Sequence, residues 1–366
     1  MNPVRIGIIG CGNISDIYFK AGARFENIEI VACADLIAER AAARAKQHRV
    51  PKAVPVKQLL RDKSIEIVLN LTVPKAHAEV ALAALEAGKH VYSEKPLALT
   101  REQGEAMLAL AKRKRLLVGC APDTFLGAAG QTARKALDDG WIGAPVAGTA
   151  FMQCHGHESW HPDPEFYYEA GGGPMFDMGP YYLTMLVQLF GPVKRVAGAA
   201  RITFPERLIT SEKKYGKRVR VETPTHVAGT LEFACGAVVS MTTSFDVWRG
   251  SLAPIEIHGT EGSMQVPDPN GFGGAVRLFR PGADDWKELP HSHIYADNAR
   301  GLGLADMAAA IRTGRPHRAN GALAIHVLDI MQAFLDSAAK GRHVALKSTC
   351  ERPAAFPLGL RPGTVD

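Results

Sequence analysis

The chain has 366 residues, of which 46% are hydrophobic and 22% charged. This composition is ordinary for a soluble globular protein, and one hydrophobic core rarely serves more than about 250–300 residues, so we expect two domains. The 43 basic and 37 acidic residues leave a net charge of +6. The basic excess lies in short separate clusters without interleaved aromatic residues, so we expect no nucleic-acid partner.

Two further features favour a cytoplasmic location. No apolar run approaches the roughly 18 residues of a transmembrane helix, and no secretory signal pattern comes before the first predicted strand. The six cysteines form no C-x-x-C pair, lying at positions 11, 33, 120, 154, 235 and 350. We therefore expect reduced thiols and no membrane contact.

Strands and helices alternate over the first 120 residues. Helices are predicted from residue 15, over 36–47 and 76–87, and from the capping box Thr100-x-x-Gln103. Apolar runs predict buried strands between them, at 4–9, 28–34, 65–71, 90–93 and 116–119. This alternation is typical of a doubly wound parallel sheet, so we assign residues 1–120 to a Rossmann dinucleotide-binding domain.

After residue 120 strands follow one another, which indicates an α+β domain built on a mostly antiparallel open sheet. We assign residues 121–366 to this substrate-binding and oligomerisation domain, and expect its late helices to cover part of one sheet face. The predicted helices are 128–138, 298–312 and 323–339; the strands are 145–154, 195–204, 227–245, 256–259 and 275–279. Apolar residues beyond simple alternation in 227–245 predict that a second subunit covers the other face, giving a homodimer or homotetramer. The tail 353–366 is predicted to be an extended arm.

A glycine motif follows the first predicted strand and opens a helix. Gly10 permits a tight turn, Gly12 lets the backbone approach a pyrophosphate, and Ser15 is small enough for close helix–strand packing. Asp35 ends the second predicted strand, where a carboxylate bonds the adenosine ribose hydroxyls. These positions predict a bound nicotinamide dinucleotide.

Asp35 favours NAD over NADP, because a carboxylate repels a 2′-phosphate. Leu36 and Ile37 supply no adjacent arginine to neutralise that phosphate, although Arg40 could reach it from the next helical turn. An alternative is that Asp35 serves as the N-cap of the following helix, and both roles are compatible.

Further motifs extend the pattern along the chain. They are Asn70-Leu71-Thr72-Val73-Pro74 with His77, then Glu94-Lys95-Pro96, then Gly171-Gly172-Gly173-x-x-x-Asp177. With Gly10-x-Gly12, these motifs make the whole chain resemble the Gfo/Idh/MocA family. The resemblance implies an NAD(P)-dependent dehydrogenase or reductase acting on a sugar, sugar derivative or cyclitol.

The resemblance also implies the catalytic residues. Lys95 corresponds to the family lysine near the nicotinamide and the reacting carbon; burial and a neighbouring positive charge lower the pKa of a lysine and suit it to proton transfer. The family then has an Asp followed four residues later by His on one helical face, and this chain has Asp177 and Tyr181. Tyrosine occurs there in some members, so Tyr181 is either the proton donor or only a substrate contact.

A segment rich in histidine, residues 154–162, lies between these motifs. Its H-x-H pattern with a further histidine could bind a metal, but the family generally needs none, so we expect no metal. We expect a substrate loop in which Trp160 offers an apolar face and His161 a hydrogen bond; the alternative is a structural loop closing over the sheet.

The predicted site therefore has two parts. The substrate residues are Lys95, Trp160, His161, Asp177 and Tyr181. The cofactor-binding residues are Gly10, Gly12, Asn13, Ile14, Asp35, Thr72, Pro74, His77, Glu94 and Lys95.

Two other functions remain open. One is a glycosidase of the same fold that uses NAD transiently and re-reduces its product. The other is a non-catalytic sensor of sugar or NAD, which the presence of both Lys95 and Asp177 disfavours.

Overall fold

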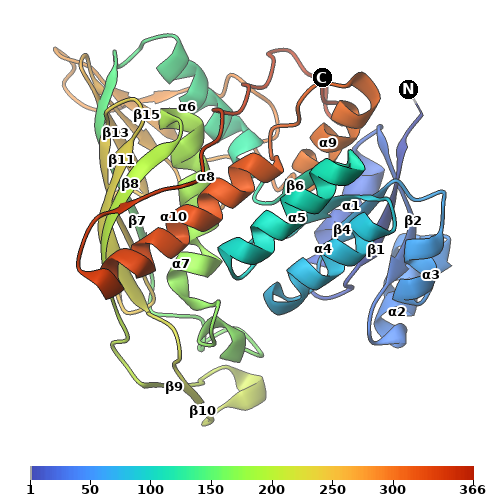
Figure 1. Ribbon diagram of the computed structural model, residues 1–366. Helices are drawn as coiled ribbons and strands as arrows, with labels where there is room; N and C mark the ends of the chain where they lie inside the picture. The colour runs from blue at the N-terminus through green and yellow to red at the C-terminus, as the bar shows by residue number, and fades with distance from the viewer. Residues whose placement is uncertain (1) are drawn as a thin grey trace. The chain divides into compact units, whose positions relative to one another are not determined.

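The computed structural model describes residues 2–366, which form two compact units (Figure 1). The first unit contains the described residues up to Gly127 together with 293–328 and 353–366, and the second contains 128–292 and 329–352. This division differs from the single boundary predicted after residue 120, because two late segments return to the first unit. Local composition carries no signal for such a return, since it depends on contacts between distant residues.

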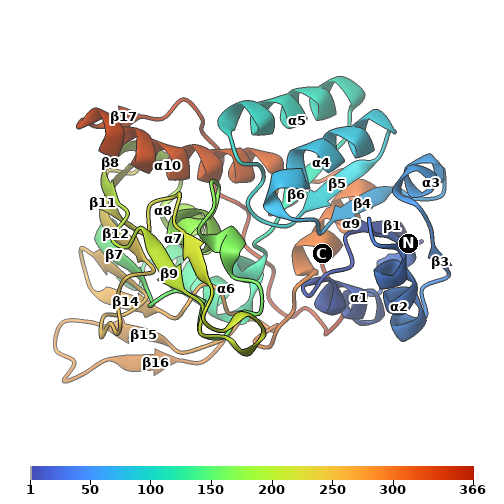
Figure 2. The same ribbon diagram turned by 90° about the horizontal axis from the view of Figure 1, so that it is seen from below.

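The first unit is built on a parallel sheet with the strand order β3-β2-β1-β4-β5-β6. Helices α4 and α5 cover one face and α1 and α9 the other (Figure 2), which confirms the predicted doubly wound fold. Cover on both faces explains why all four residues of β4 are buried. The elements are β1 (Val4–Ile9), α1 (Ser15–Arg24), β2 (Ile28–Ala34), α2 (Ala38–His48), β3 (Lys52–Ala53), α3 (Val56–Arg61), β4 (Ile67–Asn70), η1 (Pro74–Ala76), α4 (His77–Glu86), β5 (His90–Ser93), α5 (Arg101–Lys114), β6 (Val118–Cys120), η2 (Thr124–Leu126) and α9 (Leu302–Thr313).

Helix α9 belongs to this first unit, which corrects the expectation that it covers the antiparallel sheet. The Asn27 side chain donates a hydrogen bond to the Ala305 carbonyl at 2.8 Å. The buried Asp123 carboxylate accepts the N–H groups of Gly301 and Gly303, both at 2.9 Å, at the start of α9. Burial raises the pKa of Asp123 to about 6.

The second unit is built on a nine-stranded sheet with the order β16-β15-β14-β13-β7-β12-β11-β8-β17. Neighbouring strands are antiparallel except for β7 and β12, so the predicted mostly antiparallel sheet is confirmed. The elements are α6 (Ala128–Asp138), β7 (Pro145–Gln153), η3 (Glu165–Tyr167), α7 (Gly173–Asp177), α8 (Gly179–Phe190), β8 (Val193–Arg201), β9 (Glu206–Leu208), η4 (Glu212–Lys214), β10 (Arg218–Arg220), β11 (His226–Phe233), β12 (Val238–Ser244), β13 (Ile255–Gly259), β14 (Ser263–Val266), β15 (Val276–Phe279), β16 (Lys287–Leu289) and β17 (Val344–Ala345). Strands β9 and β10 form a separate small sheet.

One face of this large sheet packs on helices α6, α7 and α8 (Figure 1). Every residue of α8 is buried, including the polar Thr184 and Gln188, so its mostly apolar sequence shows no amphipathic helical period. For that reason the sequence pattern did not indicate a helix over 179–190.

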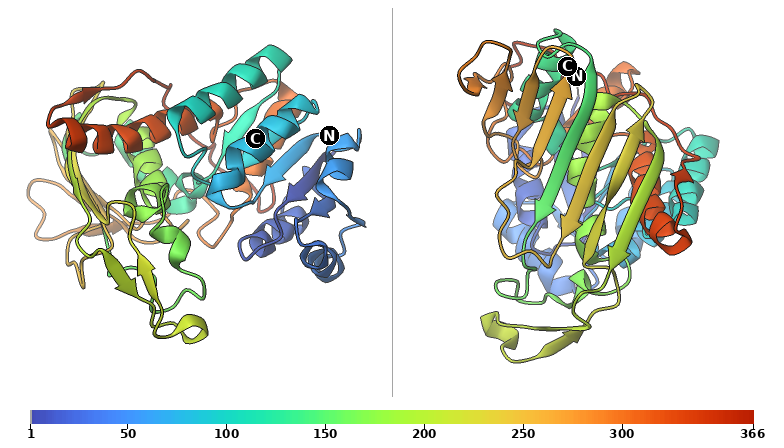
Figure 3. Two further views of the ribbon diagram at one scale, coloured as in Figure 1. Left: turned by 60° about the horizontal axis from the view of Figure 1, so that its bottom comes forward. Right: turned by 90° about the vertical axis from the view of Figure 1, so that its left-hand side faces the viewer.

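Part of the opposite face of the sheet carries small side chains. Ala197, Thr230, Ser240 and Thr149 lie opposite one another in register across four adjacent strands. Figure 3 (right) shows this face without a helix of the described chain in front of it.

Helix α10 (Gly321–Lys340) corrects the statement that no apolar segment is long enough for a membrane span. By length and composition alone, this helix could cross a membrane. More than half of the apolar stretch is, however, buried inside the protein. Its Asp329 is buried and accepts hydrogen bonds from the Ser348 backbone and hydroxyl groups. A buried core helix of a globular protein has the same composition.

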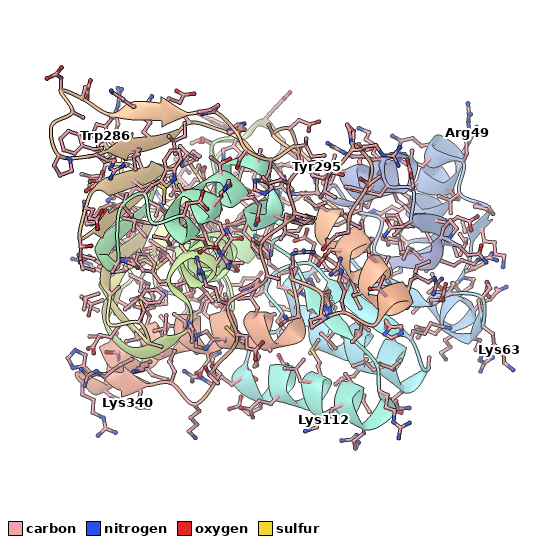
Figure 4. All side chains as sticks on the ribbon, turned by 90° about the horizontal axis from the view of Figure 1, so that it is seen from above. Arg49, Lys63, Lys112, Trp286, Tyr295 and Lys340 are labelled. Carbon is pink, nitrogen blue, oxygen red and sulfur yellow. The ribbon has the colours of Figure 1, made fainter. Side chains whose placement is uncertain are left out.

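Basic side chains of the first unit project from separate elements. Figure 4 shows Arg49 after α2, Lys63 after α3 and Lys112 on α5 pointing outward at different places. The clusters seen in the sequence therefore lie apart on this unit.

Candidate active site

The glycine motif forms the turn between β1 and α1. Gly10 has φ +101°, and a Cβ built there would lie 2.5 Å from the Leu71 carbonyl oxygen, so only glycine fits. A Cβ on Gly12 would meet no atom within 4 Å, which leaves open space above its backbone. Ile14, the N-cap of α1, makes no side-chain capping bond. Open backbone before an uncapped helix N-terminus fits the pyrophosphate of a dinucleotide.

Ser15 occupies the third position of the motif. Its side chain is fully buried, and its hydroxyl donates to the Gly12 carbonyl at 2.6 Å. The adjoining Asn13 and Ile14 are exposed on the same turn. The small Ser15 thus permits the close helix–strand packing that the motif requires.

Asp35 lies directly after β2, and its carboxylate accepts a hydrogen bond from the backbone of the glycine turn. Its Oδ2 accepts the Cys11 N–H at 2.7 Å, and its Oδ1 accepts the Ile37 N–H at 2.8 Å. The N-cap of α2 is Ile37, without a side-chain capping bond, so Asp35 is not that cap. Leu36 is 98% exposed beside it.

The segment after β4 is organised by Asn70, a buried residue that was not among the predicted site residues. Asn70 donates to the His77 carbonyl at 3.0 Å and accepts the Thr72 hydroxyl at 2.7 Å. The His77 imidazole lies 2.7 Å from the Pro96 carbonyl and 2.9 Å from that of Thr72. Burial lowers the pKa of His77, and a neutral ring donates to only one of them at a time. His77 therefore joins the two segments that flank Pro74 and Lys95.

Glu94 and Lys95 follow β5. Glu94 is buried; its Oε1 accepts the Tyr18 hydroxyl at 2.7 Å and its Oε2 the Lys95 N–H at 3.1 Å. Burial and the Glu94 charge raise the pKa of Tyr18 well above its usual value. Hydrogen bonds thus run from Tyr18 on α1 through the Glu94 carboxylate to the backbone of the half-buried Lys95. Tyr18 is therefore a supporting residue that the motifs did not indicate.

The predicted residues of the first unit gather at one sheet edge. Gly10, Asp35, Thr72 and Lys95 follow β1, β2, β4 and β5, four strands that are parallel neighbours. The carboxyl ends of parallel strands form the ligand-binding edge of such sheets. β1 and β4 also mark the point where the strand order reverses.

In the second unit, Asp177 and Tyr181 lie on two different helices, which corrects the expected single helix. Asp177 is the last residue of α7, and Tyr181 lies in the first turn of α8. Pro180 lacks the N–H that would bond to the Phe176 carbonyl, so the hydrogen bonds of a single helix are interrupted here. Tyr181 is 8% exposed.

The histidine-rich segment after β7 gives its three imidazoles three different environments. His155 stacks on Trp248 with ring centroids 3.4 Å apart, and the His157 Nε2 lies 3.3 Å from the Asp177 Oδ2. Among residues 2–366 no group of three His, Cys, Asp or Glu side chains is arranged to hold a metal ion.

The two predicted substrate residues of this segment differ in exposure. Trp160 is 61% exposed, and the half-buried His161 contacts Tyr167 with ring centroids 5.3 Å apart. The Asp163 N–H donates to Nδ1 of His161 at 3.1 Å, which leaves Nε2 as the N–H donor of the neutral ring.

Comparison with known proteins adds independent information. Residues 4–121 match the family model described as "Oxidoreductase family, NAD-binding Rossmann fold", and residues 131–265 match the "GFO/IDH/MocA C-terminal domain". The chain is 30% identical to 1,5-anhydro-D-fructose reductase of Ensifer adhaerens over 266 residues, covering 71% of this chain and 74% of that one. It is 24% identical to myo-inositol 2-dehydrogenase of Thermotoga maritima over 263 residues, covering 71% and 74%.

A solved structure of levoglucosan dehydrogenase with NADH and levoglucosan superposes with a TM-score of 0.80 at 25% identity, covering 94% of this chain and 99% of that one. The glycine turn and the parallel sheet agree with the NAD-binding Rossmann fold that the family match describes. This chain belongs to the GFO/IDH/MocA family of NAD-binding oxidoreductases.

Proposed function

We propose that this chain transfers a hydride between NAD and a hydroxyl or keto carbon of a sugar, sugar derivative or cyclitol. The observation that carries the proposal is the position of Lys95, a half-buried lysine after β5 on the sheet edge that holds Gly10 and Asp35. Relatives named as a reductase of an anhydrosugar and a dehydrogenase of a cyclitol support this substrate class.

Each predicted residue has a role in this proposal. NAD, when bound, supplies the carbon that accepts or returns the hydride. Lys95 accepts the hydroxyl proton at Nζ in the oxidative direction and returns it in reduction. Asp177 and Tyr181 orient the substrate by hydrogen bonds, Trp160 packs on its apolar face, and His161 donates from Nε2 to a hydroxyl group.

The test is a screen of NADH formation with sugars, sugar acids and cyclitols, and of NADH consumption with the matching keto compounds. We expect turnover with at least one compound. Release of an aglycone without net NADH formation would instead indicate a glycosidase that uses NAD transiently. Binding without any turnover would replace it by a sensor.

The preferred cofactor is NAD⁺. We expect calorimetry to give tighter binding of NAD⁺ than of NADP⁺, because Asp35 repels a 2′-phosphate and the exposed Leu36 and Ile37 offer it no charge. Replacing Asp35 by Ser and Leu36 by Arg should shift the preference towards NADP⁺. The Lys112→Ala variant of the distant helix α5 serves as the control. Tighter NADP⁺ binding by the wild type would overturn the assignment.

We also propose a homodimer or homotetramer in which the face containing Ala197, Thr230, Ser240 and Thr149 packs against a second copy. Its small uncharged side chains permit close sheet packing. Light scattering should give at least twice the chain mass of 39.4 kDa. Ser240→Arg should reduce the mass of the assembly by at least half, whereas Glu105→Arg on exposed α5 should leave it unchanged. A wild-type monomer at micromolar concentration would contradict the proposal.

We place the protein in the cytoplasm. All six cysteines are free thiols in the described chain, and four of them are buried: Cys11, Cys33, Cys120 and Cys350. Reduced thiols in this number suit a reducing compartment.

A further inference from the structure

The family pattern places an imidazole four residues after Asp177, and this chain has Tyr181 there on a separate helix. A different imidazole lies beside Asp177. The His157 Nε2 is 3.3 Å from the Asp177 Oδ2, and both side chains are partly exposed, by 13% and 16%. The residue that pairs with the carboxylate therefore comes from the segment after β7.

The backbone next to His157 is held by buried charges. The Glu158 Oε1 lies 3.0 Å from the Arg207 Nε, and the Glu158 carboxylate also accepts the Tyr168 hydroxyl. The Glu158 carbonyl accepts the N–H groups of Thr210 and Ser211 at 3.0 and 2.8 Å. Arg207 is only 4% exposed, so this anchor is shielded from water.

Aromatic rings fix the orientation of the His157 ring. Tyr167, Phe245 and Trp160 meet it edge-on, with ring centroids 4.4, 4.7 and 5.3 Å away. Three such contacts restrict rotation of the imidazole.

The proton on this pair follows from its chemistry. An ionised carboxylate only accepts hydrogen bonds, so Nε2 of His157 carries the hydrogen and donates to Asp177. The pairing fixes the tautomer and the orientation of the ring, and the ring in turn fixes the carboxylate, as in other His–Asp pairs.

We propose that His157 is a positioning residue whose Nε2–H holds the Asp177 carboxylate in the orientation in which it contacts the substrate. The inference rests on the proposed function, in which Asp177 contacts the substrate. The other titratable groups around the pair are His161, Tyr167 and Cys154.

The test compares two substitutions of His157. Gln keeps an N–H near the position of Nε2 and can still donate to Asp177, whereas Phe cannot. We expect His157→Phe to lower kcat by about 10²-fold, the loss that follows when a substrate-positioning group is misplaced by about 1 Å. His157→Gln should restore most of this loss, because its amide N–H still holds Asp177. His258→Gln removes an imidazole 3.6 Å from Glu256 in the same unit and should leave kcat unchanged.

A second measurement is independent of turnover. Nitrogen-15 NMR of the wild type should show His157 with hydrogen on Nε2, and Asp177→Ala should remove this preference while His258 keeps its signals. If His157→Gln loses as much kcat as His157→Phe, the hydrogen bond to Asp177 does not account for the role of His157 and the proposal is overturned. If the NMR preference is absent, the pair itself is refuted. If no compound is turned over, the oxidoreductase assignment fails, and the NMR result still decides the pairing.

Discussion

The Lys95→Ala variant should lose kcat by about 10²–10⁴-fold, because its proton acceptor is gone while the remaining site stays in place. Binding of NAD⁺ should change far less. Gly10 and Asp35 still form the turn that we propose for the pyrophosphate and the adenosine ribose, and the hydrogen bond from Cys11 to Asp35 remains. Steady-state kinetics and calorimetry of the same preparation separate the two effects.

Lys112→Ala provides the control for Lys95→Ala, since Lys112 is exposed on α5 and should be replaceable without loss. Near-full turnover by Lys95→Ala with the true substrate would refute the mechanism. Loss of NAD⁺ binding together with kcat would indicate that Lys95 mainly holds the cofactor.

Tyr181→Phe distinguishes the two roles left open for that residue. The variant keeps the buried ring of α8 and removes only the hydroxyl. A loss of kcat as large as that of Lys95→Ala would make Tyr181 the proton donor. Since His157 already gives Asp177 an imidazole partner, we expect mainly a raised KM, which is the signature of a binding contact.

The two glycines of the β1–α1 turn should respond differently to the same substitution. Gly10→Ala places a methyl group 2.5 Å from the Leu71 carbonyl at φ +101°, so the backbone must shift. We expect it to cost about 2 kcal/mol or more of unfolding free energy. Gly12→Ala meets nothing within 4 Å and should leave stability unchanged.

Binding of NAD⁺ should nevertheless weaken in the Gly12→Ala variant. The added methyl group occupies the space above the backbone where the pyrophosphate would approach. Losing one charge-assisted contact there corresponds to about 10–100-fold in Kd. Thermal melts of the apo-protein and calorimetric titrations provide the comparison. Unchanged affinity of Gly12→Ala for NAD⁺ would show that the pyrophosphate does not bind at this turn.

The cofactor half of the site could be predicted because it depends on local rules. β1, β2 and β5 have the predicted bounds, since a strand covered on both faces is a continuous apolar run ended by polar or small residues. In a parallel sheet, the residues that follow successive strands collect at one edge. Gly10, Asp35 and Lys95, which follow β1, β2 and β5, therefore lie at a common edge.

The supporting residues could not be predicted in this way. Tyr18 bonds to Glu94 across 76 positions of the chain, and Arg207 lies 49 positions beyond Glu158. A buried tyrosine or arginine in a strand or helix looks like an ordinary packing or surface residue until its partner is known. Such pairings depend on how the elements pack.

By itself, the sequence determined the two-part architecture, the dinucleotide turn and the identity of Lys95 and Asp177 as candidates, because each depends on periodicity, spacing or a motif. Only the tertiary structure decided that α9 returns to the first unit, that Asp177 and Tyr181 lie on separate helices, and that His157 lies beside Asp177. The physical reason is that burial and hydrogen-bond satisfaction act between segments distant in the chain. A carboxylate pairs with whichever imidazole the packing brings to it, and position along the sequence does not show which one that is.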